Sequence, residues 1–298
     1  MNEGDILLKK GILPAVLDER IRTALACGAL QPIQTVEELV EDGGVRFLVR
    51  MVSSLRRKEE DKNRRAAAVQ RREKPANPFL PPEPELTVAE ISRTHIAVLN
   101  KFNVLNRHLL VVTRRFEHQE TLLTPADFQT LLLCMSEYRS LGFYNGGAVA
   151  GASQPHKHLQ LVPLPLASGG TSFPMQPLLA RAGRPRCLDL SFPHAFATLT
   201  PSIGNKPPAA AEAHALYLDL LADVGIRSVS KDAKQYQSAP YNLLLAQDWM
   251  LAVPRRQELY RGISVNALGF AGSFFVKDRE QLRILREDGP MRVLQAVA

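Results

Sequence analysis

The sequence has little cysteine and no long apolar run. Its three cysteines, Cys27, Cys134 and Cys187, lie far apart among 298 residues and form no CxxC pair. This usage is typical of a reducing compartment and argues against a thiolate zinc site. No stretch reaches the roughly 18 apolar residues that span a bilayer, and the first residues lack the pattern of a secretory signal. We therefore expect a cytoplasmic protein without a membrane partner.

Aromatic residues are missing from the most highly charged part of the chain. Residues 56–74, RRKEEDKNRRAAAVQRREK, carry charges of both signs, and no aromatic residue falls between Phe47 and Phe79. Nucleic-acid-binding modules usually place aromatic residues among the basic ones. We interpret the segment as a solvated helix or connector and expect no nucleic-acid partner, with RNA contact as the alternative. The formal net charge of +7 still favours anionic ligands such as nucleotides.

What is present is the composition of a globular protein, with 45% hydrophobic and 22% charged residues, and a length that suits one large or two modest domains. Residues 94–100 and 108–113 are short, apolar and rich in β-branched side chains, with a turn-like segment between them, so we expect an antiparallel pair of strands. Residues 124–140 open with a threonine N-cap, a proline at the first helical position and an aspartate in the first turn, which predicts a helix.

The second half begins with a segment rich in proline. Nine prolines fall within residues 163–210, which predicts a long connection rather than a regular layer. Residues 211–225 predict a helix, and residues 241–246 and 249–254 predict two strands around a tight turn. Residues 278–287 predict a closing helix that begins at an aspartate N-cap, Asp278.

Residues 145–163, NGGAVAGASQPHKHLQLVP, combine a glycine-rich loop with two histidines and a glutamine at every second position. Side chains at i, i+2 and i+4 share one face of a strand, whereas a helix would point them in different directions. We therefore expect His156, His158 and Gln160 to project together and the residues between them to point to the opposite face. Small residues before the strand let backbone N–H groups approach an anion. The stretch predicts a phosphate cradle that leads to a pair of imidazoles.

Three roles are open for this histidine pair. The two side chains could satisfy backbone groups at a sheet surface, or chelate a metal ion, although the stretch offers no third ligand. A neutral imidazole could instead attack a phosphorus atom while its other nitrogen is held by a carbonyl. Gln160 favours the third role, because an amide binds a phosphate oxygen without titrating.

The same residues resemble a known family. HKHLQL is similar to the HxHxQ signature of the transferase branches of the histidine-triad superfamily, and FYNGGAVAGASQPHKHLQ resembles the diadenosine tetraphosphate phosphorylases, also called ATP adenylyltransferases. Residues 95–128, 241–255 and 266–277 are similar to further parts of that family. The resemblance implies an α+β protein with the histidine-triad (HIT-like) fold, in which helices pack on an antiparallel sheet and a smaller C-terminal part completes the cleft.

We divide the chain into three parts on this basis. Residues 1–170 form a HIT-like catalytic region with an N-terminal helical segment, residues 171–210 a proline-rich connection, and residues 211–298 a C-terminal ATP adenylyltransferase region.

The resemblance also implies a ping-pong nucleotidyltransferase. His158 would attack the α-phosphorus of diadenosine tetraphosphate, release ATP and carry AMP, which phosphate then takes as ADP; the reverse reaction and ADP-sulfurylase activity belong to the same family. His156 would orient the nucleophile or contact phosphate, and Gln160 would bind the α-phosphate. Matched residue by residue, the expected substrate contacts are Lys58, Asn100, Lys101, Asn145, Gly151, Ala152, Ser153, Gln154, Asn266, Ala267, Leu268, Ser273 and Lys277.

Other functions stay open at this point. Galactose-1-phosphate uridylyltransferases share the asparagine, glycine, serine and HxHxQ pattern, but they usually place proline where Lys157 stands, and some have paired cysteines for a structural metal. Histidine-triad hydrolases usually carry histidine where Gln160 stands, so water is the less favoured acceptor. A nucleotide-sensing or RNA-binding protein is the non-enzyme alternative. We expect Mg²⁺ or another divalent cation to bridge the polyphosphate, without a fixed protein metal site. The sequence leaves the oligomeric state open.

Overall fold

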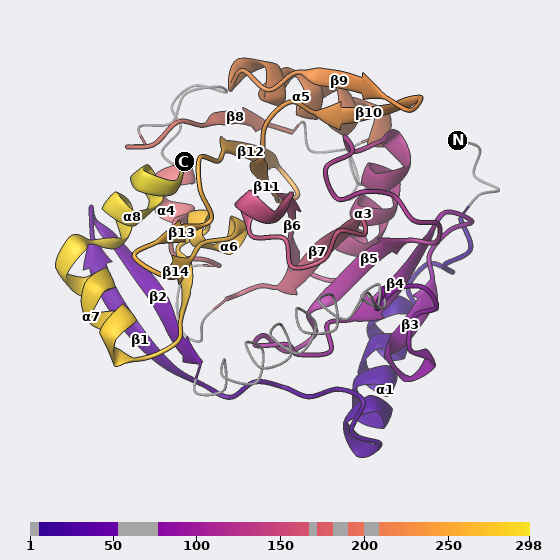
Figure 1. The fold of residues 1–298 in the computed structure, drawn as a ribbon. Coiled ribbons are helices and arrows are strands. Elements are labelled where there is room, and N and C mark those ends of the chain that lie inside the picture. The colour runs from indigo at the N-terminus through magenta and orange to yellow at the C-terminus, as the bar shows by residue number, and fades with distance from the viewer. Residues whose placement is uncertain (1–5, 53–76, 167–171, 181–189, 200–208) are drawn as a thin grey trace, which may run out of the picture.

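The computed structural model describes residues 6–52, 77–166, 172–180, 190–199 and 209–298. Its largest element is an eight-stranded sheet in the order β3-β4-β5-β7-β6-β11-β12-β8, in which all neighbouring strands are antiparallel (Figure 1). The strands are β3 (Thr87–Glu90), β4 (His95–Leu99), β5 (Leu109–Thr113), β7 (His158–Pro163), β6 (Ser140–Gly146), β11 (Tyr241–Leu245), β12 (Trp249–Pro254) and β8 (Ala195–Thr198).

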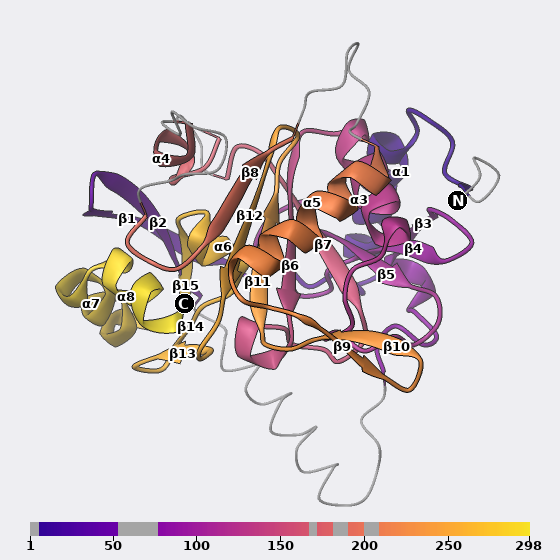
Figure 2. The ribbon, with the colours of Figure 1, turned by 90° about the horizontal axis from the view of Figure 1, so that it is seen from above.

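Alternation along the central strands divides the apolar side chains between two cores, one on each face of the sheet. In β6, Tyr144 belongs to the first core and Phe143 to the second, and Leu243 and Leu244 of β11 divide in the same way. Three helices pack into the first core (Figure 2), namely α1 (Leu13–Ala26), α3 (Pro125–Glu137) and α5 (Ala210–Asp223). None of the helices in the described ranges is both long and apolar enough to cross a bilayer.

The second core is closed by segments from both ends of the sequence. β1 (Thr35–Asp42) and β2 (Val45–Val52) form a hairpin, and β15 (Ser273–Val276) pairs with β2 in parallel. The rings of Phe47 and Phe274 meet there with their centroids 5.9 Å apart. The helices α4 (Gln176–Ala180), α6 (Ala267–Phe270), α7 (Arg279–Asp288) and α8 (Pro290–Val297) contribute to this core. The remaining described elements are the hairpins β9 (Ser228–Lys231) with β10 (Lys234–Gln237) and β13 (Leu259–Tyr260) with β14 (Ile263–Ser264), and the 3₁₀ turns η2 (Pro84–Leu86) and η3 (Ala148–Ala150).

Local sequence signals set the helix starts as predicted. Thr124 and Asp127 form a capping box at α3, in which each side chain accepts the backbone N–H of the other residue. Asp278 caps α7 by accepting the N–H of Gln281. The predicted helices and strand pairs are confirmed by α3, α5, α7, β4–β5 and β11–β12. The last helix of the chain is α8, however, and not α7 as predicted.

The prediction of a long connection over residues 163–210 is wrong in two places. Residues 176–180 form α4, and residues 195–198 form β8, which pairs with β12 and so becomes the edge of the large sheet. A run of seven residues free of proline follows Pro193, and an edge strand needs hydrogen bonds on one side only.

The α+β class with an antiparallel sheet and packed helices is confirmed. The strands of residues 1–170 and 211–298 share one sheet, because β6 pairs with β11 in the register Gly146↔Tyr241. The two parts therefore belong to one structural unit, while the division into three parts stays a prediction.

Candidate active site

His158 and Gln160 lie on β7, and His156 precedes it in an isolated bridge to His118. Lys157 points to the opposite face, where its Nζ is 2.7 Å from Glu117 Oε2. The strand and its two faces are therefore as predicted. All three residues of the motif are buried, with exposed fractions of 0% for His156, 3% for His158 and 8% for Gln160.

The geometry of His158 leaves one ring nitrogen as a nucleophile. Its Nδ1 is 2.8 Å from the carbonyl oxygen of His156. A carbonyl can only accept, so Nδ1 carries the hydrogen and Nε2 carries the lone pair. Burial lowers the pKa of His158 to about 4, which keeps the ring neutral at neutral pH. No base is needed to prepare such a nucleophile.

Gln119 fixes the backbone of His158 where the strands β6 and β7 separate. The ladder ends at Phe143↔Gln160, and the same register would next pair Tyr144 with Leu159 and then Asn145 with His158. Between them, Gln119 Oε1 accepts the N–H of His158 at 2.9 Å, and its Nε2 donates to the Asn145 carbonyl at 2.9 Å. The side-chain amide thus takes the place of a peptide group in the sheet and opens the strands beside the glycine-rich loop.

His156 is held on both of its ring nitrogens. The amide of Asn77 accepts the N–H of Phe79 through Oδ1, so its Nδ2 donates to His156 Nδ1 at 2.9 Å. His156 Nε2 therefore carries the hydrogen, and it donates to the carbonyl of Thr113 at 2.8 Å. The ring of Phe79 contacts both His156 and His158, with centroids 5.6 and 5.5 Å away. His156 thus holds the ring of His158 through its backbone carbonyl, and both nitrogens of its own imidazole are engaged by protein groups.

Gln160 ends a short relay of side chains. Its Oε1 is 3.0 Å from His108 Nε2, and His108 Nδ1 is 3.1 Å from Asn100 Nδ2. If Asn100 donates to Nδ1, His108 carries its hydrogen on Nε2 and donates to Gln160 Oε1. This polarity leaves the Nε2 group of Gln160 to donate to a ligand.

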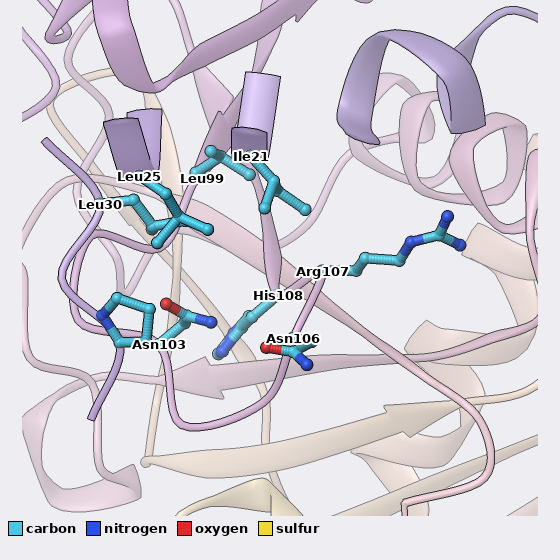
Figure 3. Close-up of a pocket in the computed structure, with 9 residues that line it drawn as sticks. Ile21, Leu25, Leu30, Leu99, Asn103, Asn106, Arg107 and His108 are labelled. Carbon is cyan, nitrogen blue, oxygen red and sulfur yellow. The ribbon is translucent and has the colours of Figure 1, made fainter. Parts of the chain in front are cut away.

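A small pocket lies beyond this relay (Figure 3). Ile21 and Leu25 of α1 form an apolar wall, and Asn103, Asn106 and His108 lie across from them. Asn103 Oδ1 is buried and has no hydrogen-bond partner within the described ranges, a setting suited to an ordered water. No residue of β7 lines the pocket, so it is separate from His158.

The glycine-rich loop packs directly against the segment before α6. A Cβ on Gly151, whose φ is +91°, would lie 2.8 Å from Asn266 Cβ, so only glycine fits this approach. Asn145 Oδ1 accepts the N–H of Ala267 at 3.0 Å, and Asn266 caps the same short helix by accepting the N–H of Leu268. The backbone donors of Ala267 and Leu268 are thus already satisfied within the protein.

Hydrogen bonds of Arg255 link the glycine-rich loop, β11, the segment before α6 and the end of α8. Its guanidinium donates to Asn242 Oδ1, to the carbonyl of Val265 at 2.8 Å and to that of Val297 at 3.0 Å. Asn242 Nδ2 in turn donates to Asn145 Oδ1 and to the carbonyl of Ala150, both at 2.8 Å. Burial lowers the pKa of Arg255 to about 10, so it remains a cation at neutral pH beneath the glycine-rich loop. A buried positive charge there favours an anionic ligand.

The other predicted contacts are distributed unevenly. Ala152, Ser153 and Gln154 continue the loop that leads into His156, and Ser153 is exposed. Lys101 forms an ion pair with Glu83 at 2.8 Å. Ser273 is buried on β15, where its hydroxyl accepts from Arg50 at 2.9 Å, and Lys277 is exposed beyond that strand. Lys58 lies outside the described residues.

The sequence reasoning missed five residues that build the site, namely Asn77, His108, Gln119, Asn242 and Arg255. None of the five is among the catalytic or substrate-contact residues expected from the sequence. Gln119 and Asn77 carry no periodic signal, because they come from loops. An arginine in AVPRR and an asparagine in YNLLL, each within or next to an apolar strand, are the signals that could have indicated buried polar partners.

No group of three or more His, Cys, Asp or Glu side chains suitable for a metal ion occurs in the part of the chain that the structure describes. Glu117 and Asp127, the carboxylates behind the histidine strand, are engaged by Lys157.

Comparisons with known proteins bear on this site. Residues 3–181 match the family model described as the Ap4A phosphorylase N-terminal domain, Ap4A being diadenosine tetraphosphate, and residues 188–298 match the ATP adenylyltransferase C-terminal domain. The chain belongs to the Ap4A phosphorylase family. It is a nucleotidyltransferase, as the resemblance implied.

Relatives in Saccharomyces cerevisiae agree with this assignment. Diadenosine 5',5'''-P1,P4-tetraphosphate phosphorylase 2 is 30% identical over 252 residues, which cover 72% of this chain and 73% of the relative. Protein APA1 is 28% identical over 240 residues, covering 68% and 70%. The crystal structure of the yeast Ap4A phosphorylase Apa2 superposes with a TM-score of 0.76 at 24% identity over 96% of this chain and 94% of that chain. A second crystal structure of Apa2, in complex with AMP, gives a TM-score of 0.73 at 25% identity, covering 96% of each chain.

Proposed function

We propose that this protein cleaves Ap4A with phosphate to give ADP and ATP, through AMP carried on His158. The observation that carries the mechanism is the buried, neutral imidazole of His158, whose Nδ1–H is fixed on the carbonyl of His156. Its Nε2 lone pair is therefore aimed by the fold before any substrate arrives. The yeast relative diadenosine 5',5'''-P1,P4-tetraphosphate phosphorylase 2 is named for this substrate, and one Apa2 structure is described as a complex with Ap4A.

The reaction proceeds in two displacements. Nε2 of His158 attacks the α-phosphorus, the bond from that phosphorus to the bridging oxygen breaks, and ATP leaves with the electron pair. An oxygen of phosphate then attacks the same phosphorus, the N–P bond breaks, ADP forms and the neutral imidazole returns. Each half is an in-line displacement, so the protein has to position groups and stabilise charge.

Three features supply that stabilisation. Gln160 donates its Nε2 group to an α-phosphate oxygen because His108 holds its Oε1. The glycine-rich loop around Gly151 offers backbone N–H groups, and the buried cation of Arg255 lies beneath it. The position of Asn100 at the start of this relay favours its role near the nucleotide.

Mg²⁺ is proposed as part of the substrate complex. Since the described residues offer no cage of carboxylates, the polyphosphate and water would supply its ligands, and its chemistry is charge neutralisation. EDTA should lower turnover and added MgCl₂ should restore it; unchanged turnover in EDTA would contradict this part of the proposal.

The acceptor and the location extend the proposal. Sulfate is a tetrahedral dianion like phosphate, so ADP-sulfurylase activity is expected to use the same AMP-His158 intermediate. A cytoplasmic location is supported by the free cysteines Cys27 and Cys134, and fluorescent tagging of the full chain would test it.

The deciding experiment combines product analysis with intact-protein mass spectrometry. With phosphate, Ap4A should give ADP and ATP; without it, the protein should gain the mass of AMP on His158. His158→Asn should abolish both signals and Gln160→Ala should slow turnover, whereas His194→Asn, a control outside the site, should do neither. AMP and ATP formed irrespective of phosphate would indicate a hydrolase. Turnover of UDP-glucose with galactose 1-phosphate alone would indicate a uridylyltransferase, and nucleotide binding without any adduct a binding protein.

A further inference from the structure

A row of ring contacts leads from the nucleophile to the protein surface. Phe79 contacts His158 and His156, and Phe116 contacts His156 with the ring centroids 5.4 Å apart. Phe116 contacts His118 at 6.4 Å, and His118 contacts Tyr236 at 6.2 Å. The mechanism above uses only the first members of this row.

Two of the outer rings of the row are exposed to solvent, and the third, Tyr236, is half-buried. Phe116 is 48% exposed, which is unusual for a phenylalanine, and the side chain of His118 is 40% exposed. Tyr236 lies on the hairpin β9–β10 opposite Val229, itself 47% exposed, and this hairpin joins the segment after β5 through the bridge Thr121↔Tyr236. Two elements far apart in the sequence thus bring three rings together at one surface.

We propose that three residues, Phe116, His118 and Tyr236, bind the adenine of the ATP that leaves the reaction; we call them the aromatic platform. This adenine belongs to the adenosine of Ap4A that is distant from His158. The inference rests on the proposed function. Aromatic side chains are suitable partners for nucleobases, because stacking needs no particular hydrogen-bond pattern.

The order of residues along β7 gives the platform its direction. Gln160, with His108 and Asn100, lies on one side of His158, and His156 with Phe116 lies on the other side. Residues two apart on a strand are separated by roughly 6.6 Å. If the transferred AMP lies on the side of Asn100, the leaving polyphosphate extends towards His156. The platform is the aromatic surface that it meets there.

The test compares two substrates that differ in the second adenosine alone. Ap4A and adenosine 5'-tetraphosphate share the α-phosphorus and four phosphates, and the second releases inorganic triphosphate in place of ATP. Tyr236→Ala and Phe116→Ala should raise the KM for Ap4A about tenfold, the loss of one stacking contact. The KM for adenosine 5'-tetraphosphate should stay the same in Tyr236→Ala, because Tyr236 does not touch His156.

Matched variants separate stacking from folding. Phe116→Trp keeps an aromatic surface and should restore the KM for Ap4A, and Leu259→Ala, an equally exposed apolar side chain on β13, should change neither substrate. Equal effects of Tyr236→Ala on both substrates, or no effect on either, would overturn the platform while leaving the proposed function intact. A wild-type protein that turns over neither substrate would overturn both.

Discussion

The hydrogen bond between His108 and Gln160 predicts a large loss of activity when its donor is removed. His108 Nε2 is 3.0 Å from Gln160 Oε1, and both side chains are buried. In His108→Phe a ring of similar size remains, but the oxygen of Gln160 loses its donor. A buried acceptor left unsatisfied costs about 1–3 kcal/mol, and the freed amide can turn its Nε2 group away from the phosphate. We therefore expect kcat/KM for Ap4A to fall about ten- to a hundredfold.

A double-mutant cycle tests whether His108 acts through Gln160. The cycle needs kcat/KM for wild type, His108→Phe, Gln160→Ala and the double variant, with thermal unfolding of each. If Gln160 is the route, His108→Phe removes little further activity once Gln160 is alanine. Asn106→Ala is the control and should retain full activity. Asn106 is exposed, lies on the same loop as His108 and lines the same pocket. Additive losses in the double variant would refute the relay.

Three further predictions concern the surroundings of the nucleophile. Burial lowers the pKa of His158 to about 4 in the folded protein, so the unfolded chain takes up a proton at this histidine at a higher pH than the folded chain does. The free energy of unfolding should therefore fall by up to ~3 kcal/mol as the pH drops from about 6.5 to 4. Urea unfolding should show this loss reduced in His158→Asn. Gly151→Ala should cost about 1–3 kcal/mol and raise the KM, since its Cβ would meet Asn266 at 2.8 Å; unchanged urea midpoints would contradict this. Lys157→Met should cost about 3–5 kcal/mol in thermal unfolding, because it leaves the buried Asp127 carboxylate without its cation; Asp127→Asn in the same background should recover part of the loss.

The elements of the fold that sequence reasoning predicted correctly depend on local patterns. The two-residue period of His156, His158 and Gln160 requires a strand, and the capping box of Thr124 and Asp127 requires a helix start. Both patterns are complete within five residues, so neither needs knowledge of distant partners.

The parts that were missed depend on pairings between distant segments. β15 follows β2 by more than two hundred residues, and a parallel pairing leaves no turn signal in the sequence. Gln119 enters the sheet from a loop, and its role arises only because β6 and β7 separate at Asn145. No spacing rule indicates that an amide will replace a peptide group.

The predicted substrate residues differ in how much the fold supports them. Asn145 and Gly151 join the loop to α6 through contacts seen in the structure, so the fold supports their positions beside the predicted site. Ser273 and Lys277 were inferred from the resemblance alone, and Ser273 is engaged by Arg50. Their roles as substrate contacts stay predictions.

In the proposed mechanism, the protonation state of His158 explains why many of its neighbours serve to hold it in position. A neutral imidazole with a lone pair on Nε2 needs no proton transfer before it attacks phosphorus, and its Nδ1–H can share the positive charge that develops with the carbonyl of His156. The backbone around that carbonyl is held by Gln119 on one side, and the imidazole of His156 is held by Asn77 on the other. A displacement of about 1 Å at this ring would cost far more rate than a change in its basicity. The residues that set the rate are therefore expected to include Gln119 and Asn77, which are not expected to take part in the proton chemistry.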